Sequence, residues 1–162
     1  WGIETYKFSD GTTKTLADVR AKMTAGTSGN DTITGFNYVG EALNGLTGND
    51  SINGASGDDT ITGGAGIDTL TGGDNSDVFD YNALSESTKT ATDRITDFST
   101  AYDRIDVRGL GFTGIASGAA GGTKLGYSYD SANDDTIVTA STNFKLILDG
   151  HLALDGTDFI FS

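Results

Sequence analysis

Apolar and polar positions repeat along residues 26–80 with a period of nine residues. Each unit ends in a triplet that places one apolar residue between two small or β-branched ones, as in residues 60–62 (Thr-Ile-Thr) and 69–71 (Thr-Leu-Thr). Such a triplet is typical of a short strand with one buried face. The apolar positions are Ile33, Leu43, Ile52, Ile61, Leu70 and Phe79. The pattern therefore predicts six short strands that share one row of inward apolar side chains.

The six residues before each strand are rich in glycine and predict turns. Residues 63–71 (Gly-Gly-Ala-Gly-Ile-Asp-Thr-Leu-Thr) carry glycine at the first, second and fourth places of the unit and aspartate at the sixth. Glycine permits positive φ and close approach of neighbouring backbones, which tight stacked turns require. Residues 45–80 hold four units in strict register, and residues 26–34 and 36–44 are weaker copies separated by Gly35. We predict a stack of coils with two units to each coil.

The sixth-place acids are the candidate metal ligands. With two units per coil, acids 18 residues apart lie on the same edge, so we expect Asp50 to stack over Asp68 and Asp59 over Asp77. Glu86, nine residues after Asp77, is expected to close the last coil under Asp68. The full set of expected ligand acids is Asp31, Glu41, Asp50, Asp59, Asp68, Asp77 and Glu86.

Calcium is the cation that this pattern favours. A hard cation takes about six to eight oxygens, and magnesium demands stricter octahedral geometry than calcium does. Stacked glycine-rich turns supply backbone carbonyls beside the carboxylates. The expected backbone ligands are Gly45, Gly48, Gly54, Gly57, Gly63, Gly66 and Gly72. We predict several Ca²⁺ ions as the cofactor.

The nonapeptide resembles the calcium-binding repeat of RTX proteins, which form a parallel β-helix. The expected fold is therefore all-β: a parallel β-roll, that is, a right-handed solenoid of nonapeptide repeats, with an antiparallel carboxy-terminal cap and one short amino-terminal helix. The expected domains are an amino-terminal cap at residues 1–25, the β-roll at residues 26–88 and the carboxy-terminal cap at residues 89–162.

The amino-terminal segment predicts a strand, a turn and a helix. Residues 3–8 are strand-like and residues 9–12 (Ser-Asp-Gly-Thr) indicate a turn. Thr15 and Asp18 have the spacing of a capping box that begins a helix. Because the end of a solenoid needs a cap, we expect this helix to close the first coil. Its apolar face consists of Leu16, Val19 and Met23.

After Phe79 the nine-residue period fades and short apolar strands follow. We interpret this half as an antiparallel cap that extends the core and protects the last edge of the roll. The expected strands are residues 95–98, 104–107, 125–129, 136–140, 144–148 and 158–161, with loops at residues 117–122 and 131–135.

Motifs in this second half resemble the R-modules of secreted bacterial mannuronan epimerases. They are residues 93–98 (Asp-Arg-Ile-Thr-Asp-Phe), 103–107 (Asp-Arg-Ile-Asp-Val), 110–114 (Leu-Gly-Phe-Thr-Gly), 144–150 and 158–161. The resemblance implies a non-catalytic, calcium-loaded module that accompanies an upstream catalytic or repeat module, assists secretion and in some members binds alginate. The repeats alone also fit the alternative of a folding and secretion domain from an RTX protease, lipase or adhesin without glycan binding.

Charge is distributed very unevenly in this chain, whose net charge is −13. Between Lys22 and Lys89 there are ten acids and no lysine or arginine. Like charges at this density oppose folding, and divalent cations would remove the repulsion. The acidity argues against nucleic acid as a partner.

Localisation is predicted as secreted, with type I secretion machinery as a partner and a monomer as the expected state. Residues 158–162 end the chain with an acid followed by apolar residues, which is similar to type I export signals. The amino end lacks an initiator methionine and reads as part of a longer chain. No apolar stretch is long enough for a transmembrane helix, so no membrane span is expected.

The chain offers little for catalysis. His151 is the single histidine and cysteine is absent, so neither a two-histidine zinc site nor a cysteine nucleophile is available. We predict that the chain is not an enzyme. The regular threonines of the repeats would also suit an ice-binding face, but strand propensity explains them adequately.

A polyuronate such as alginate would need cations along an extended face. The candidate glycan-binding residues are Lys89, Arg94, Arg104, Arg108, Lys124 and Lys145, with Tyr127 and Tyr129 as stacking surfaces. The alternative is that these cations balance neighbouring acids in surface pairs worth about 0–1 kcal/mol each.

Overall fold

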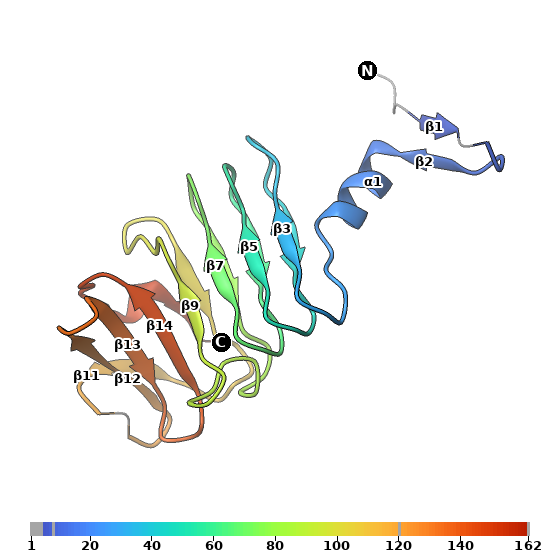
Figure 1. The fold of residues 1–162 in the computed structure, drawn as a ribbon. Helices are drawn as coiled ribbons and strands as arrows, with labels where there is room; N and C mark the ends of the chain where they lie inside the picture. Colours follow the sequence, from blue (N-terminus) through green and yellow to red (C-terminus); the bar gives the residue numbers. More distant parts are fainter. Residues whose placement is uncertain (1–4, 8, 120, 162) are drawn as a thin grey trace.

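Two sheets face each other around one apolar core in the computed structural model, which describes residues 5–7, 9–119 and 121–161 (Figure 1). One sheet has five strands in the order β15-β10-β8-β6-β4, and the other has eight in the order β11-β12-β13-β14-β9-β7-β5-β3. A small hairpin and one helix extend from the amino-terminal end (Figure 1). The predicted all-β roll is confirmed.

The six repeat strands alternate between the two sheets, as two units per coil require. They are β3 (Thr32–Thr34), β4 (Ala42–Asn44), β5 (Ser51–Asn53), β6 (Thr60–Thr62), β7 (Thr69–Thr71) and β8 (Val78–Asp80). Pairing is parallel and joins equivalent residues, such as Ile52 with Leu70 and Ile61 with Phe79. Ile61, Leu70 and Phe79 are 0% exposed. The apolar place of each unit therefore fills the space between the sheets.

Both sheets continue beyond the repeats. β9 (Asp93–Ile95) lies beside β7, and β10 (Arg104–Asp106) lies beside β8, again in parallel. β15 (Phe159–Ile160) pairs in parallel with β10 and follows a short 3₁₀ helix at Gly156–Asp158, where the sequence analysis expected strand from residue 158. The predicted end of the roll was residue 88, whereas the parallel coils run on through β10.

The rest of the carboxy-terminal half is partly antiparallel. β12 (Lys124–Asp130), β13 (Asp135–Thr139) and β14 (Lys145–Asp149) form an antiparallel meander. β14 pairs in parallel with β9, and β11 (Gly114–Ser117), which the sequence analysis did not predict, pairs in parallel with β12. The meander extends the eight-stranded sheet, and its inward residues continue the core of the roll.

The amino-terminal segment contains β1 (Thr5–Lys7), β2 (Thr13–Thr15) and α1 (Leu16–Met23). The two strands are antiparallel, and the sequence analysis did not predict β2. Residues 3, 4 and 8 of the predicted first strand lie outside the described residues. The predicted capping box is present, because the Thr15 side chain accepts from the Asp18 N–H and the Asp18 carboxylate accepts from the Thr15 N–H.

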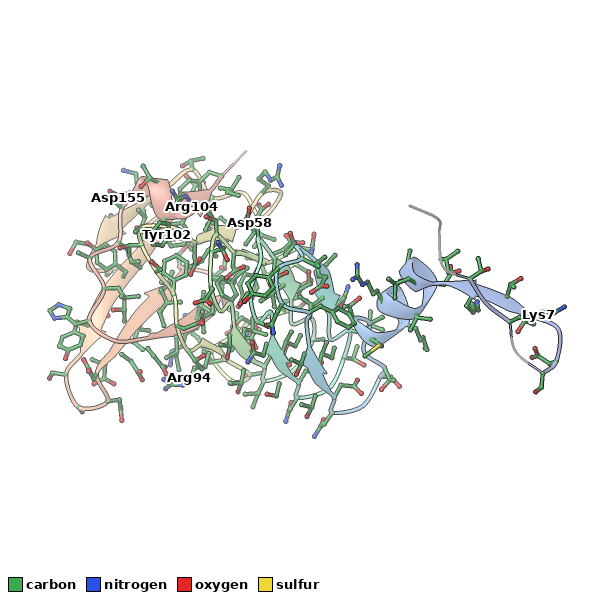
Figure 2. The ribbon with its side chains drawn as sticks, turned by 90° about the horizontal axis from the view of Figure 1, so that it is seen from above. Lys7, Asp58, Arg94, Tyr102, Arg104 and Asp155 are labelled. Atoms are coloured by element: carbon green, nitrogen blue, oxygen red, sulfur yellow. The ribbon has the colours of Figure 1, made fainter. Side chains whose placement is uncertain are left out.

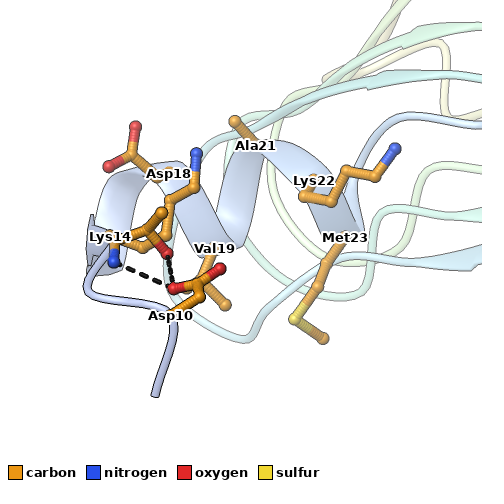
Figure 3. Close-up of a pocket in the computed structure, with 8 residues that line it drawn as sticks. Asp10, Lys14, Asp18, Val19, Ala21, Lys22 and Met23 are labelled. Atoms are coloured by element: carbon orange, nitrogen blue, oxygen red, sulfur yellow. Dashed lines mark hydrogen bonds between the residues drawn. The ribbon is translucent and has the colours of Figure 1, made fainter. Parts of the chain in front are cut away.

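The helix does not close the first coil, so that expectation is wrong. α1 has no buried residue, Leu16 and Met23 are 40% and 54% exposed, and the helix projects away from the roll (Figure 1). Val19 and Met23 line a hollow on its open side together with charged residues (Figure 3). Most of the eight helical positions hold polar residues or alanine, which leaves too little apolar surface for a plug.

Candidate metal centre

The turns on one edge of the roll align four acids, which we call the first ladder: Asp31, Asp50, Asp68 and Asp93. The backbone N–H of each of the first three donates to the carboxylate of the acid one coil further on. Asp31 N–H donates to Asp50 Oδ1 at 2.8 Å, Asp50 N–H to Asp68 Oδ1 at 2.8 Å, and Asp68 N–H to Asp93 Oδ1 at 3.0 Å. One carboxylate oxygen of Asp50, Asp68 and Asp93 is therefore held in place by the neighbouring coil.

The opposite edge carries the second ladder: Glu41, Asp59, Asp77 and Asp103. Glu41 N–H donates to Asp59 Oδ1 at 2.8 Å, Asp59 N–H to Asp77 Oδ1 at 2.9 Å, and Asp77 N–H to Asp103 Oδ1 at 3.0 Å. The two ladders place the predicted acids Asp50 and Asp68, and likewise Asp59 and Asp77, on adjacent coils of one edge.

Six of the eight ladder acids have a further carboxylate oxygen that is buried and has no hydrogen-bond partner, whereas Oδ2 of Asp31 accepts from Thr27 and Oδ2 of Asp103 from Ser99. The six unpartnered oxygens are Oδ2 of Asp50, Asp59, Asp68, Asp77 and Asp93, and Oε1 of Glu41. No ion pair of the described chain involves a ladder acid, because the salt bridges join Arg94 to Asp135 and Asp149, and Arg108 to Asp106. An unpaired buried carboxylate is costly. The ladders are thus two rows of buried oxygens that a bound cation would stabilise.

Burial makes ionisation of the ladder acids unfavourable. It raises the pKa of Asp68 and of Asp77 to about 6, and that of Asp93 to about 8. Burial likewise raises the pKa of Asp50 and Asp59. Neighbouring carboxylates raise these pKa values further, and the hydrogen bonds along the ladder oppose the shift. A cation beside the row would favour the ionised form instead.

Because the first glycine of a unit has no side chain, a carboxylate oxygen and a backbone carbonyl oxygen can both lie close to it. A Cβ added to Gly45 would come within 3.0 Å of both Asp50 Oδ2 and the Gly63 carbonyl oxygen. Gly54 has the same relation to the Asp59 Oδ2 and the Gly72 carbonyl. Carboxylate and carbonyl oxygens are the donors that calcium prefers. The donor set of the ladders therefore fits calcium.

The fourth-place glycines have a different position from the first-place ones. Gly48, Gly57 and Gly66 have φ of 120°, 138° and 153°, and an added Cβ on each would meet a backbone carbonyl of the preceding coil within 3.0 Å. Any side chain there would push the coils apart. Of the predicted backbone ligands, the structure thus places Gly45, Gly54, Gly63 and Gly72 beside the acid oxygens, and Gly48, Gly57 and Gly66 against the neighbouring coil.

Two units keep the turn shape without a second glycine. Leu46 and Ala55 have φ of 72° and 76°, in the left-handed region. The side chain of the preceding asparagine supports each turn, because Asn44 Oδ1 accepts from Leu46 N–H at 2.9 Å and Asn53 Oδ1 from Ala55 N–H at 2.8 Å. The backbone path of the ladder turns is therefore preserved.

The place under Asp68 that was predicted for Glu86 is taken by Asp93. Glu86 Oε2 instead accepts from Asn82 N–H at 2.8 Å within its own loop. The turn between β8 and β9 is lengthened, so the spacing from Asp68 is 25 residues rather than 18. Asp103 was missed for the same reason, at a spacing of 26 from its ladder partner. The available signal was an acid two residues before a buried isoleucine, as in residues 93–95 and 103–105.

The two ladders end differently. Asp103 is satisfied without a cation, because its Oδ2 accepts from Ser99 N–H at 2.9 Å. Asp97 accepts from the N–H groups of Gly72 and Gly73 at 2.9 and 2.8 Å and so caps the neighbouring turn. Asp93 Oδ2, at the end of the first ladder, has no partner.

The ladders are built from pairs of acids rather than clusters. Within residues 5–7, 9–119 and 121–161, no three His, Cys, Asp or Glu side chains converge as a metal-binding group. Each interval between coils offers two acids, and any further ligands would come from the backbone.

The candidate glycan-binding cations do not form one continuous strip. Arg94 lies on the opposite side of the molecule from Arg104 (Figure 2). The Arg94 guanidinium donates to both oxygens of Asp135 at 2.8 Å and also contacts Asp149. Arg108 Nη2 pairs with Asp106 at 2.6 Å. Acids of this chain therefore neutralise two of the three candidate arginines.

Three candidate lysines lie near one end of the β12–β14 meander. The segments of Lys89 and Lys145 are paired, since Lys89 N–H donates to the Asn143 carbonyl at 3.0 Å and Lys145 N–H to the Ser87 carbonyl at 3.2 Å. Lys124 begins β12 at the same end, because β12, β13 and β14 pair in register.

The two candidate tyrosines lie on the same strand, β12, but differ in exposure. Tyr127 is partly buried and packs against the core. Tyr129 stacks on His151 with ring centroids 3.9 Å apart and an interplanar angle of 14°. Only Tyr129 presents a large exposed area.

Comparison with known families identifies the family to which this chain belongs. The family model described as "Peptidase M10 serralysin C terminal" matches residues 10–142. The chain belongs to this serralysin carboxy-terminal family. Among curated relatives, mannuronan C5-epimerase AlgE3 of Azotobacter vinelandii is 41% identical over 52% of this chain and 5% of its own length. Alginate lyase 7 of the same organism is 40% identical over 49% of this chain and 10% of its own length.

Solved structures agree with this assignment. The AlgE6R3 subunit of the A. vinelandii mannuronan C5-epimerase has a TM-score of 0.69 and 31% identity, over 85% of this chain and 81% of that one. The AlgE6R2 subunit gives 0.69 and 30%, over 85% and 91%. The expected resemblance is confirmed: this serralysin-type chain is an RTX-type β-roll module homologous to epimerase R-modules, not to their catalytic part. The chain spans a tenth or less of the curated relatives named here.

No helix in the described part of the chain is long and apolar enough to cross a membrane.

Proposed function

We propose that this module is a non-catalytic calcium-binding β-roll that folds when calcium enters its two ladders. The observation that carries the proposal is the row of buried carboxylate oxygens without partners on each edge. The acids of adjacent coils would hold each ion together with carbonyls of the first-place glycines. Calcium supplies the positive charge that stabilises the ionised carboxylates.

The same chemistry couples binding to folding. A ligand that binds only the folded chain adds its binding free energy to stability. With ten acids and no base between Lys22 and Lys89, the repeats would stay unfolded at low calcium, because nothing offsets the repulsion. At millimolar calcium outside the cell the coils would form. This property suits export through a type I channel in an extended state, followed by folding outside.

The test compares two adjacent aspartates with different positions. Asp59 is buried in the second ladder, whereas Asp58 is exposed and accepts from Ser76 N–H. Asp59→Asn and Asp58→Asn remove the same charge. We expect Asp59→Asn to weaken calcium binding in calorimetry and to raise the calcium concentration at which strand signal appears in circular dichroism. Asp58→Asn should stay close to the parent.

Two results would count against the proposal. One is a circular dichroism spectrum that excess chelator leaves unchanged. The other is an equal effect of the two substitutions, which would assign the loss to net charge rather than to the ladder.

Export is the second part of the proposed function. β15 pairs with β10 through Ile105 and Phe159, so the end of the chain covers the last parallel edge. Deletion of residues 158–162 is expected to abolish type I export and to lower the melting temperature in calcium. Normal export of the truncated chain would contradict the proposed role of this end.

Polyuronate binding is a further candidate, favoured by the names of the relatives and by the lysines gathered at one end of the meander. A Lys89→Glu, Lys145→Glu double variant should lose affinity for oligouronates, most visibly at low salt, where screening is weakest. Lys7→Glu with Lys14→Glu is the matched control on the exposed amino-terminal hairpin. Calorimetry with equal affinities for both double variants would remove the lysine group from the binding face.

A further inference from the structure

Two asparagines of the roll are each followed directly by a glycine. They are Asn44 before Gly45 and Asn53 before Gly54, and no other asparagine of the sequence has this neighbour. Asparagine is one of the thermolabile residues. A following glycine leaves its backbone nitrogen easy to approach, because glycine has no side chain and moves freely. These two pairs are therefore the positions of the chain at which a side-chain amide is most easily lost.

The reaction at such a pair is an internal cyclisation. The backbone nitrogen of Gly45 loses its proton and bonds to Cγ of Asn44, while the bond from Cγ to Nδ2 breaks and ammonia leaves. Water then opens the resulting five-membered succinimide at either of its two carbonyls. One opening gives aspartate and the other gives isoaspartate. The reaction consumes only water and needs no oxidant or reductant.

The fold engages the attacking nitrogen of both pairs. Gly45 N–H donates to the Thr62 carbonyl at 3.0 Å, and Gly54 N–H donates to the Thr71 carbonyl at 2.9 Å. Both glycines are buried. A buried, hydrogen-bonded amide gives up its proton only after the structure opens locally. The nitrogen is therefore unable to attack while the coil is closed.

The asparagine side chains are exposed to water but are also engaged. Asn44 Oδ1 accepts from Leu46 N–H at 2.9 Å, and Asn53 Oδ1 accepts from Ala55 N–H at 2.8 Å. Such a bond from an asparagine to the backbone two residues on forms a turn of its own. Ring closure has to break this bond as well, so the formed turn opposes the reaction at both of its atoms.

The two products affect the roll differently. Aspartate keeps an oxygen that can accept the same backbone N–H. Isoaspartate carries the main chain through Cγ and so adds one atom before the glycine nitrogen. Neighbouring coils pair residue for residue, Asn44 with Thr62 and Asn53 with Thr71. The extra atom moves the glycine out of its hydrogen bond to the next coil, so we expect isoaspartate to prevent the coil from closing.

We propose that Asn44 and Asn53 are sites of spontaneous deamidation, which the closed roll protects and the unfolded chain exposes. This protection is separate from calcium binding, but its consequence rests on the proposed calcium-dependent folding. Chains that remain without calcium acquire isoaspartate and lose the ability to fold when calcium is added.

The test incubates the full chain at mildly alkaline pH in calcium, in chelator, and in chelator with concentrated urea. Circular dichroism establishes whether the chain is folded in each solution. Peptide mapping by mass spectrometry measures conversion at residues 44 and 53, and an isoaspartyl methyltransferase assay measures isoaspartate. We expect conversion at both residues to be at least about tenfold slower in calcium than in urea, which an opening free energy of about 1.4 kcal/mol already gives.

Two double variants complete the design. Asn44→Gln with Asn53→Gln is the matched control, because glutamine keeps an amide but closes a six-membered ring more slowly. It should show little conversion in urea. Asn44→Asp with Asn53→Asp represents the aspartate product and should fold in saturating calcium. Parent chains aged in urea and returned to calcium should leave an unfolded fraction that is enriched in isoaspartate.

The outcomes separate the protection from the proposed function. Equal rates at residues 44 and 53 in urea and in calcium, where the chain is folded, would overturn the proposal. Equal conversion in the parent and in the double glutamine variant would place the reaction elsewhere and refute the assignment. If the chain stays folded in chelator, calcium-dependent folding fails, while the comparison of folded chain with chain in urea still tests the protection. Slower conversion at both residues in the folded chain supports it.

Discussion

Replacing Asp68 by asparagine should change stability in opposite directions with and without calcium. The amide retains an oxygen that can accept the Asp50 N–H, so the ladder hydrogen bond persists. The negative charge is lost. Without calcium this removes an unfavourable buried charge, and with calcium it removes a ligand.

The magnitude without calcium follows from the pKa. Burial, followed by neighbouring acids, raises the pKa of Asp68 from 3.8 to about 6. A folded-state pKa above the unfolded value gives stability that is present at low pH and lost as pH rises through the folded value. At about 1.4 kcal/mol per pH unit, the loss at neutral pH and above is at most about 3 kcal/mol. The asparagine variant escapes this loss.

The magnitude with calcium has the opposite sign. Asp68 flanks two intervals of the first ladder, one toward Asp50 and one toward Asp93. An ion at a hundredfold excess over its dissociation constant stabilises by about 2.7 kcal/mol. Losing both ions would cost about 5 kcal/mol, which exceeds the gain of about 3 kcal/mol. The variant should therefore become the less stable protein by about 2 kcal/mol.

The assay is urea unfolding followed by circular dichroism at pH 7.5 over a calcium series. A fixed concentration of sucrose keeps the chelated protein folded, since excluded osmolytes favour the compact state. Asp74→Asn, at an exposed acid, provides the same charge change outside the ladders. Plotted against calcium concentration, the free energies of unfolding of the parent and of Asp68→Asn should cross. Those of the parent and of Asp74→Asn should not cross. A variant that is less stable at every calcium concentration, or that matches the control, refutes the reasoning.

Three further predictions concern other parts of the molecule. Arg94→Gln should lower the free energy of unfolding by about 2 kcal/mol, because the Asp135 side chain, which is 5% exposed, loses its charged partner. In the same urea titration, the control Lys124→Gln should change the free energy of unfolding by less than about 0.5 kcal/mol. Leu46→Gly should raise the free energy of unfolding by up to about 1 kcal/mol, because a φ of 72° strains leucine. An unchanged urea midpoint would contradict this prediction. In chelator with the same sucrose concentration, acidification from pH 9 to pH 5 should raise the melting temperature, because Asp93, with a pKa of about 8, becomes protonated. In limiting calcium the same change of pH should lower the melting temperature, because protons compete with calcium for the ligands.

The repeats were predictable because each unit meets copies of itself. A residue such as Ile61 pairs with the same position of the next coil. The local sequence pattern therefore predicts both a strand and the strand that pairs with it. Parallel pairing, two units per coil and the buried apolar row followed from this periodicity. The acids were placed on the correct edges by the same argument, as the hydrogen bonds from Asp50 and Asp59 to the next coil show.

The ends of the ladders escaped prediction because they depend on loop length. Once the turn before β9 exceeds six residues, the spacing no longer tells which acid completes the edge, and Glu86 was chosen over Asp93. β11 was missed because it lies in a glycine-rich stretch whose strand character depends on pairing with β12. Local propensity was insufficient where a distant partner decides the conformation.

Charged residues showed the same limit. Arg94 was a candidate for polyuronate because nothing near it in sequence indicates what neutralises it. Its partners Asp135 and Asp149 lie 41 and 55 residues further along the chain and reach it only through the pairing of β9, β13 and β14. Whether a surface cation is available to a ligand is thus a property of the fold.

The unequal ends of the ladders also imply an order of assembly. The end of the second ladder needs no ion, because Asp103 and Asp97 are satisfied by backbone N–H groups of Ser99, Gly72 and Gly73. The coil next to the carboxy-terminal half can therefore dock along that edge before calcium arrives, and the coils nearer the amino end cannot. We infer that folding proceeds from the carboxy-terminal side as calcium rises. In hydrogen exchange at limiting calcium, the amides of Gly72 and Gly73 should gain protection before that of Gly45, and the reverse order would exclude this direction of assembly.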